Sequence, residues 1–340
     1  MTSRPRVLVL GGTQFIGRAT VDVLLATAKY EITIVTRGRT PSPFDGDASV
    51  RHVLCDRRNS GALRALLASD PRPWHAVVDF LAFEPDDVRP ILELGERAGL
   101  YVVISTDSVY MACAPAGFVR DAAGRLDEMS IGQRDAARAK EDEYGADKLA
   151  LEEELQARGG AAGLRFVALR LPDVLGEHEN TGRQEKLFKR LVRGAKVGTR
   201  IDGGDADAPI SVVFAADVGA AIARLLEAPR EAVAGAGALH ICCAETPTWH
   251  DLVELAAELL HDQGIEVPPV AFDDAKENPL VSVDVGALSG AKAARLLPGW
   301  APAPLRERLA EAVAAWVGEM RDAYDGQVRD EERRARRGDS

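Results

Sequence analysis

Short β-prone runs alternate with amphipathic segments along the first half of the chain. The β-prone runs are rich in aliphatic and β-branched residues and span 6–10, 31–35, 50–55, 75–80 and 100–105. Between them, apolar residues recur at helical spacing in 15–28, 61–68 and 88–98. Apolar strands that alternate with helices are typical of a parallel sheet covered on both faces. The pattern therefore predicts an α/β fold with a doubly wound, parallel (Rossmann) sheet.

The second half of the chain follows the same pattern less regularly. A helix over 142–157 and a buried strand over 164–171 are predicted, but residues 111–139 are rich in Gly, Pro, Asp and Arg and predict a long loop. Loops of this length in compact domains are usually functional. We expect a dinucleotide-binding domain over 1–172 rejoined by about 211–245, a smaller interleaved C-terminal substrate lobe formed by 173–210 and 246–317, and a charged, disordered tail over 318–340.

Charge and composition limit the classes of partner. The 340 residues include 42 basic and 53 acidic side chains, a net charge of −11, which argues against binding nucleic acid or an anionic membrane through bulk charge. The cysteines, Cys55, Cys113, Cys242 and Cys243, are irregularly spaced and are expected to be reduced core thiols. No apolar run approaches the roughly 20 residues of a membrane span, and no signal-peptide pattern is present, so we expect a soluble cytoplasmic protein.

A glycine-rich turn follows the first strand. Glycines there allow a tight turn, and the helix N-terminus behind it offers N–H groups to a pyrophosphate. At the first strand-to-helix connection of a βαβ series, this turn predicts dinucleotide binding. The predicted pyrophosphate contacts are Gly11, Gly12, Gln14, Phe15, Ile16 and Gly17.

The ends of the next strands indicate which dinucleotide is preferred. The second strand ends without the carboxylate that would bind the adenosine ribose and carries Arg37 instead, which suits a 2′-phosphate. We therefore expect NADP(H) to be preferred, with NAD(H) as the alternative. Asp56 could accept a hydrogen bond from the adenine amino group, Arg57 could flank the ring, and Leu81 should line the floor beneath the cofactor ribose.

A proton-transfer group is predicted on the 142–157 helix. Tyr144 and Lys148 stand four residues apart, so both side chains share one face. A free tyrosine has a pKa near 10 and needs a nearby cation to become a base, which Lys148 could supply. Thr106 ends the fifth strand and could hydrogen-bond the reacting carbonyl or alcohol.

Together these features resemble the extended short-chain dehydrogenases/reductases of the NAD-dependent epimerase/dehydratase family. The matching segments cover most of the chain: GGTQFIG, STDSVY, the Tyr144–Lys148 pair, RLPDVLG, FAADVGAAI and GAKAARLLPGWAP. Gln14 replaces the middle glycine of the family's turn and would crowd or hydrogen-bond the bridging phosphates.

The resemblance implies roles for further residues. Tyr144 would be the acid/base, Lys148 its electrostatic partner and a cofactor contact, and Thr106 the third catalytic group. Pro172 would lie near the nicotinamide and Asp173 on the substrate side. Asp107 matches the acid of the family's dehydratases, but Ser108 replaces the glutamate that follows it, which disfavours sugar 4,6-dehydration.

The substrate side departs from the sugar-nucleotide members. Many of them carry an arginine that binds the diphosphate, where this chain has Ala208-Pro209-Ile210-Ser211. A basic cluster at 183–200, beginning with Arg183, could instead attract an anionic substrate. Glu177, His178 and Glu179 have poor metal-ligand spacing, and no metal is expected.

Our first hypothesis is an NADP(H)-dependent oxidoreductase acting on a secondary alcohol or ketone of a small metabolite. The alternatives are a sugar or sugar-nucleotide epimerase/dehydratase and a non-catalytic dinucleotide- or RNA-binding protein. The RNA-binding alternative follows from a similarity of the glycine turn to that of chloroplast stem-loop-binding proteins. The family resemblance also implies a homodimer, with the helix bearing Tyr144 as a candidate interface.

Overall fold

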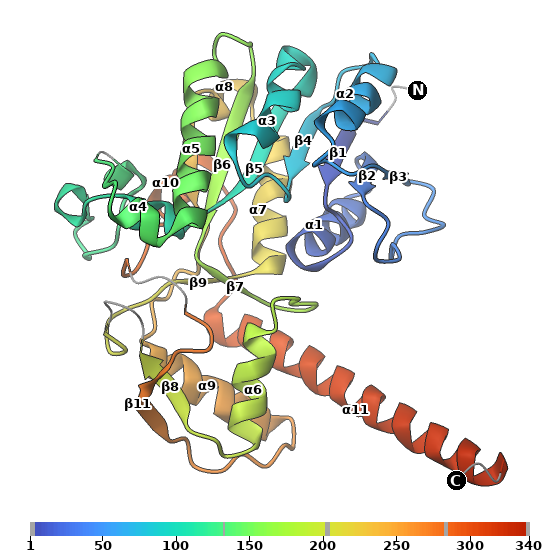
Figure 1. Cartoon of the computed structure of the whole chain (residues 1–340), viewed down its shortest axis with the longest axis vertical. Coiled ribbons are helices and arrows are strands. Elements are labelled where there is room, and N and C mark those ends of the chain that lie inside the picture. The colour runs from blue at the N-terminus through green and yellow to red at the C-terminus, as the bar shows by residue number, and fades with distance from the viewer. Residues whose placement is uncertain (1–3, 132, 201–204, 282–284, 338–340) are drawn as a thin grey trace.

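A parallel sheet forms the centre of the larger domain (Figure 1). The computed structural model describes residues 4–131, 133–200, 205–281 and 285–337. Its seven-stranded sheet has the order β3-β2-β1-β4-β5-β6-β10, and every neighbouring pair is parallel. The strands are β1 (Arg6–Leu10), β2 (Glu31–Thr36), β3 (Val50–Leu54), β4 (Ala76–Asp79), β5 (Leu100–Thr106), β6 (Arg165–Leu171) and β10 (Gly237–His240).

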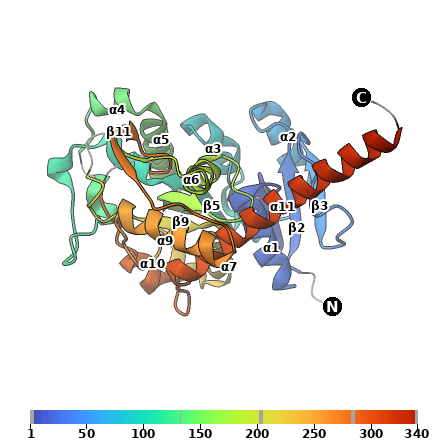
Figure 2. The same cartoon turned by 90° about the horizontal axis from the view of Figure 1, so that it is seen from below.

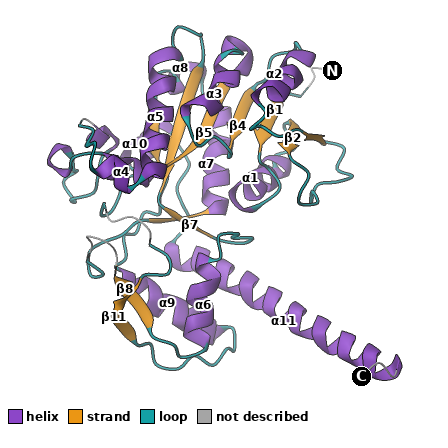
Figure 3. Cartoon of the chain, in the orientation of Figure 1, coloured by secondary structure: helices purple, strands orange, loops and turns teal. Residues whose placement is uncertain are grey.

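Alternate residues of each strand face opposite layers of helices, as β1 illustrates. Val7 and Val9 pack with α1 (Phe15–Ala26), α7 (Ala215–Glu227) and α10 (Ala291–Leu296), whereas Leu8 and Leu10 pack with the opposite layer. That second layer comprises α2 (Ser60–Ser69), α3 (Pro85–Leu92) and α5 (Glu143–Arg158). Figure 3 shows helices on both sides of the strands. The predicted doubly wound fold is confirmed.

A smaller lobe lies below the carboxyl ends of the strands (Figures 1 and 2). It packs the amphipathic helix α6 and the helix α9 against the first turns of α11, around the edge-to-face pair Phe188–Trp316. Trp249 is fully buried there and donates its indole N–H to the Gly198 carbonyl at 3.0 Å. The elements of this lobe and its connections are β7 (Asp173–Leu175), α6 (Arg183–Val192), β8 (Val197–Arg200), β9 (Val212–Phe214), α9 (Trp249–Asp262), β11 (Phe272–Glu277) and α11 (Leu305–Arg337).

Two features differ from the predicted domain boundaries. The segment 285–297 packs on the larger domain, where Lys292 donates to the carbonyls of Ala236 and Ala238. In addition, α11 continues as a helix to Arg337 through the segment expected to be a disordered tail, and it extends away from the small lobe (Figures 1 and 2). That segment contains six Arg and three Glu, which favour helix even without an apolar face.

Candidate active site

The glycine turn after β1 is shaped by its backbone. Gly11 has a φ of +94°, and a Cβ at this position would lie 2.7 Å from Leu81 Cγ. A Cβ at Gly17 would lie 2.0 Å from the Gly11 carbonyl oxygen. Gly12 instead faces the core, where its Cβ would meet Val9 and Val21 at 3.0 Å. The turn therefore leaves no room for side chains at its three glycines, and the Gly11 N–H donates to the Val35 carbonyl at 3.0 Å.

The predicted turn residues except Gly12 line a hollow that we call the turn cavity. It has a volume of about 320 Å³ and is lined by Gly11, Thr13, Gln14, Phe15, Ile16, Gly17, Thr36, Arg37, Arg39, Thr40, Phe80, Leu81, Phe83, Ile104 and Asn180. Gln14 is the N-cap residue of α1, but its side chain makes no cap hydrogen bond. It donates to Thr40 Oγ1 at 3.1 Å and accepts from Asn180 at 3.5 Å. The Gln14 side chain thus contacts Thr40 and Asn180 and does not bond the first N–H groups of α1.

A second hollow, the strand-end cavity, continues from the turn cavity past the ends of β2 and β3. The two share Arg37, Leu81 and Phe83, and the strand-end cavity also includes Asp56. Arg37 is exposed, and no ion-pair partner for it occurs within the described ranges. Asp56 is also exposed and accepts the N–H of Arg58 at 3.0 Å. Both side chains are therefore accessible from the strand-end cavity, and their contacts with a dinucleotide stay predictions.

Arg57 differs from its predicted role. Its side chain is 5% exposed and pairs with the fully buried Asp79 at 2.9 Å, so the guanidinium is not free to flank an adenine ring. Asp79 also accepts the hydroxyl of Tyr101 and the N–H of Leu81, each at 2.9 Å. Asp87 adds a carboxylate 3.9 Å from the Arg57 guanidinium. This buried network holds Leu81 beneath Gly11.

The predicted catalytic and substrate-side residues meet at the carboxyl ends of β5 and β6. They line the Tyr144 cavity, of about 860 Å³, which shares Phe15, Ile16, Phe80, Phe83 and Ile104 with the turn cavity. The predicted residues in its wall are Thr106, Asp107, Ser108, Tyr144, Lys148, Pro172, Asp173 and Arg183. The strands bring these distant segments together because parallel strands end at the same edge of the sheet.

Tyr144 lies in the wall of this cavity with a high pKa. Loss of hydration raises the pKa of Tyr144 to about 12, and the charge of Asp107 acts in the same direction. A hydrogen bond with Thr106 and the charge of Arg183 act against this rise. The phenol is therefore protonated at neutral pH and close to the Thr106 hydroxyl.

Lys148 is held by the main chain. Its ammonium donates to the carbonyls of Ala82 at 2.6 Å and Ile104 at 2.8 Å, and lies 5.8 Å from the centre of the Tyr144 ring. Burial lowers the pKa of Lys148 to about 8, while Asp79 is the strongest of the charges that oppose this decrease. Lys148 is therefore predominantly charged below pH 8.

Two carboxylates, those of Asp107 and Asp173, line the substrate side of the Tyr144 cavity. Asp107 is buried, and loss of hydration, together with the charge of Asp173, raises its pKa well above the ordinary value. Asp173 accepts a hydrogen bond from Arg183 at 2.6 Å. Asp107 is therefore easier to protonate than an ordinary aspartate.

The sequence analysis missed Arg138, which also lines the Tyr144 cavity. Arg138 belongs to α4 (Arg138–Glu141), inside the predicted long loop, and its charge and helical setting were the available signals. Within the basic cluster at 183–200, a fully described segment, only Arg183 reaches this cavity. The cluster therefore contributes one residue rather than a basic surface.

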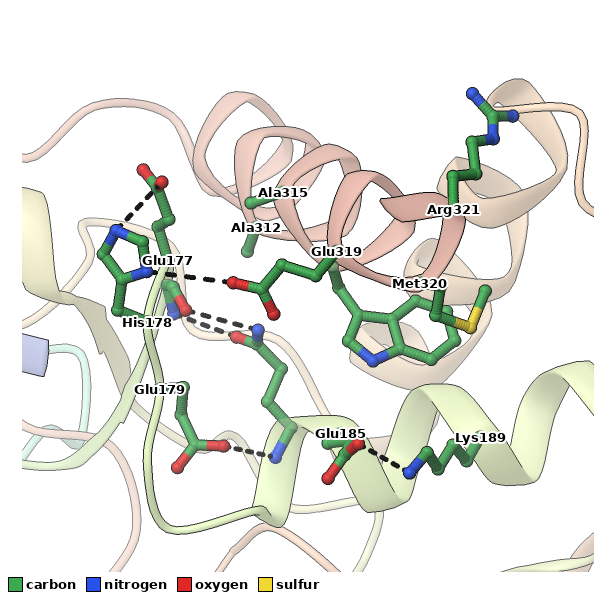
Figure 4. A pocket seen from close by; sticks show the side chains of 13 residues that line it. Glu177, His178, Glu179, Glu185, Lys189, Ala312, Ala315, Glu319, Met320 and Arg321 are labelled. Carbon is green, nitrogen blue, oxygen red and sulfur yellow. Dashed lines mark hydrogen bonds and ion pairs between the residues drawn. The ribbon is translucent and has the colours of Figure 1, made fainter. Parts of the chain in front are cut away.

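A separate hollow lies between the 176–179 loop, α6 and α11 (Figure 4). His178 contacts Glu177 at 3.1 Å and Glu319 at 3.8 Å, and Lys189 pairs with Glu185 at 2.5 Å. Across the part of the chain that the structure describes, no three potential metal ligands gather in one place. Glu177, Glu319 and Glu185 pair with neighbouring side chains, and Glu179 accepts the N–H groups of Thr181 and Gln184.

Comparison with known proteins shows the family of this chain and the kinds of protein that share its fold. The model of the NAD dependent epimerase/dehydratase family matches residues 7–241. A UDP-glucose 4-epimerase from Thermotoga maritima is 19% identical with a TM-score of 0.68, covering 93% of this chain and 99% of that chain. A dTDP-glucose 4,6-dehydratase from Bacillus anthracis is 18% identical with a TM-score of 0.69, covering 92% of this chain and 97% of that chain. No curated protein matches the chain.

The fold and the residues at its strand ends define an enzyme of the extended short-chain dehydrogenase/reductase type. The chain belongs to the NAD dependent epimerase/dehydratase family. The space left by Gly11 and Gly17 and the uncapped start of α1 fit the pyrophosphate of a nicotinamide dinucleotide. Among the helices of the described residues, none is long and apolar enough to cross a membrane.

Proposed function

We propose that this enzyme catalyses NADP(H)-linked oxidation or reduction at a secondary alcohol or ketone of a small metabolite. The observation that best supports this proposal is the meeting of Tyr144, Thr106 and Lys148 in one cavity that continues into the turn cavity. A ligand in the turn cavity would thus adjoin a substrate bound beside Tyr144. Gly11, Gln14, Phe15, Ile16 and Gly17 would hold the dinucleotide's pyrophosphate, with Lys148 and Pro172 near its nicotinamide end.

The proton chemistry follows from the side chains of the cavity. A bound nicotinamide dinucleotide supplies or accepts the hydride. The protonated phenol of Tyr144 can donate to a carbonyl oxygen during reduction, and the neighbouring Thr106 hydroxyl can donate a second hydrogen bond to the same oxygen. The charged Lys148 stabilises the phenolate that forms when Tyr144 has given up its proton.

Replacing Tyr144 by Phe tests the assignment of the proton donor. Tyr144→Phe keeps the ring, which packs at 6.4 Å from Phe83, and removes only the hydroxyl. We expect kcat to fall by about 10²- to 10⁴-fold, with an unchanged dissociation constant for NADPH measured by fluorescence titration. An unchanged kcat would remove Tyr144 from the mechanism.

Replacing Arg37 by Ala tests the preference for NADP(H). The exposed guanidinium would bind the 2′-phosphate through charge-assisted hydrogen bonds, so Arg37→Ala should weaken NADPH binding by about 10- to 100-fold and leave NADH binding nearly unchanged. Arg51→Ala is a matched control, because Arg51 is exposed on β3 outside the cavities described above. Equal losses for both dinucleotides would contradict the assignment.

The second candidate function is epimerisation, in which transient oxidation leaves no net redox change. The likeness to a UDP-glucose 4-epimerase and to a UDP-glucuronic acid 4-epimerase from Bacillus cereus supports it. Incubation with ketones or nucleotide sugars, followed by nicotinamide absorbance and product chromatography, separates the two functions. A net absorbance change supports the oxidoreductase, and a new isomer without one supports the epimerase.

Membership of the NAD dependent epimerase/dehydratase family favours the catalytic functions over the non-catalytic alternative. The homodimer through α5 and the cytoplasmic location remain predictions. Size-exclusion chromatography with light scattering tests the dimer directly.

A further inference from the structure

A further cavity opens beside the Tyr144 cavity, under the long loop that the sequence pattern predicted. We call it the arginine cavity; its volume is about 710 Å³, and it shares Met111 and Arg138 with the Tyr144 cavity. Its other walls come from the 115–125 loop, from Ala208 and Pro209, and from 285–287. A molecule bound beside Tyr144 could therefore extend into it.

The arginine cavity differs from the Tyr144 cavity in charge. Three arginines, Arg120, Arg125 and Arg138, line it, and no other ionisable side chain does so in the described ranges. Arg125 is neutralised by Asp121 at 2.9 Å. In a protein with a net charge of −11, a wall that carries only cations is a local reversal of sign.

Arg120 and Arg138 are not paired with a carboxylate among the described residues. Arg120 donates to the carbonyls of Gly124 at 3.0 Å and Val285 at 3.1 Å, and Arg138 donates to the carbonyl of Met111 at 3.1 Å. Within the described part of the chain, neither guanidinium has a carboxylate in ion-pair distance. The carbonyls fix the guanidinium groups without cancelling their charge.

The loop that carries Arg120 is anchored to the larger domain. Leu126, fully buried, donates its N–H to the Ala287 carbonyl at 2.7 Å and accepts from the Ser289 N–H at 2.8 Å. Arg120 and Leu126 form an antiparallel bridge. The cationic groups are therefore placed before any ligand binds, which lowers the entropic cost of binding.

We propose that the arginine cavity is a substrate subsite that binds an oxyanion, a phosphate or carboxylate group, at the end of the substrate distant from Tyr144. Arg120 and Arg138 are its specificity-determining residues, because two guanidinium groups that no carboxylate of the described residues compensates suit the charge and planar lone pairs of an oxyanion. This inference rests on the proposed function, since it assigns the reacting carbon to the Tyr144 cavity.

Binding of simple anions to the full chain tests the subsite without knowledge of the substrate. The probes are inorganic phosphate and malonate, titrated by calorimetry with saturating NADP⁺ so that the turn cavity is filled. We expect Arg120→Gln and Arg138→Gln each to weaken anion binding by about tenfold or more. The anion that binds more tightly to the unaltered chain identifies the preferred group.

Two further variants serve as controls. Arg134→Gln removes a cation of the same loop that pairs with Glu153 at 2.6 Å outside the cavity, and it should leave anion binding unchanged. Arg120→Lys keeps the charge but loses the planar guanidinium, so it should bind the anion less tightly than the unaltered chain and more tightly than Arg120→Gln. The proposal is overturned if neither anion binds, if Arg134→Gln weakens binding as much as Arg120→Gln, or if Arg120→Lys loses as much as Arg120→Gln.

The result is independent of the test of Tyr144. Anion binding that depends on Arg120 together with an unaffected Tyr144→Phe variant would support the subsite and reject the proposed mechanism. Loss of activity in Tyr144→Phe without any arginine-dependent anion binding would support the mechanism and reject the subsite. Once a substrate is known, Arg120→Gln should raise KM with little change in kcat.

Discussion

The turn cavity and the Tyr144 cavity adjoin one another but are built in opposite ways. The first depends on the backbone of one continuous stretch, 10–17, whose shape requires the absence of side chains at Gly11 and Gly17. The second depends on the side chains of Tyr144, Asp107 and Arg183, which come from segments far apart in the sequence. A change of backbone shape should therefore impair ligand binding in the turn cavity, whereas a change of charge should impair the Tyr144 cavity.

Among the variants that test this comparison, the largest effect is expected when the backbone of the turn is forced to move. In Gly17→Ala, the new Cβ would lie 2.0 Å from the Gly11 carbonyl oxygen, so the turn must open. We expect dinucleotide affinity to fall by about 100-fold or more, equivalent to roughly 2.7 kcal/mol or more. Fluorescence titration with NADPH measures the loss.

Gly160→Ala is the matched control for this prediction. No heavy atom lies within 4 Å of a Cβ built at Gly160, so the variant should bind NADPH as the unaltered chain does. Circular dichroism of both variants checks that the fold is retained. Normal affinity in a folded Gly17→Ala protein would show that the turn does not depend on its backbone shape.

The same contrast explains what the sequence could predict. The strands and the glycine turn are local features, because apolar periodicity and glycine spacing are visible in a few adjacent residues. The strand end that carries Thr106 and the helix face that carries Tyr144 were likewise visible locally, whereas the position of Asp173 in the same cavity was implied only by the family resemblance. These parts of the site needed no knowledge of side-chain packing.

Pairings between distant side chains could not be predicted in this way. Arg57 was expected at the adenine ring because it follows Asp56, but its partner Asp79 lies on another strand, and no local pattern signals that pair. Arg138 was missed because a four-residue helix within an irregular loop has no clear periodicity. The helical extension to Arg337 depends on charged residues whose propensity alone is a weak signal.

The buried network around Asp79 connects the two cavities and gives the second prediction. Asp79 holds the N–H of Leu81, which lies beneath Gly11, while the next residue, Ala82, accepts the Lys148 ammonium. Its negative charge also raises the pKa of Lys148 against the effect of burial. Asp79 should therefore influence Lys148 without touching the substrate.

We expect Asp79→Asn to shift the alkaline limb of the pH profile of kcat/KM to lower pH, with activity at pH 8 about tenfold lower. The remaining charges around Lys148 are Glu152 and Asp87, which raise its pKa, and Arg57, which lowers it. With Asp79 neutral, Lys148 loses its proton earlier as pH rises. A pH series of initial rates measures the shift.

Tyr101→Phe provides the control for charge. It removes the 2.9 Å hydrogen bond to Asp79 and keeps the carboxylate charge, so the alkaline limb should stay in place. The two variants should also differ in stability, because Asp79→Asn leaves the buried Arg57 without its closest carboxylate. Identical pH profiles for both variants would show that hydrogen bonding, rather than charge, is what Asp79 contributes.

The smallest effect is expected at Asp107, whose carboxyl is costly to ionise where it lies. Burial and the charge of Asp173 raise the pKa of Asp107, so the folded chain binds this proton more tightly than the unfolded chain. Folding stability from this group is therefore greatest below the unfolded pKa of about 3.9 and decreases as pH rises towards the folded value. Asp107→Asn removes the ionisation, so it should raise Tm at pH 8 by roughly 2 °C relative to the unaltered chain.

Below pH 4 the difference between the two proteins should disappear, because Asp107 is then protonated in both the folded and the unfolded states. Differential scanning calorimetry across pH 3.5 to about 8 measures the trend. A lower Tm for the variant at pH 8 would mean that the hydrogen bond Asp107 accepts from Thr106 stabilises the fold more than its buried charge destabilises it.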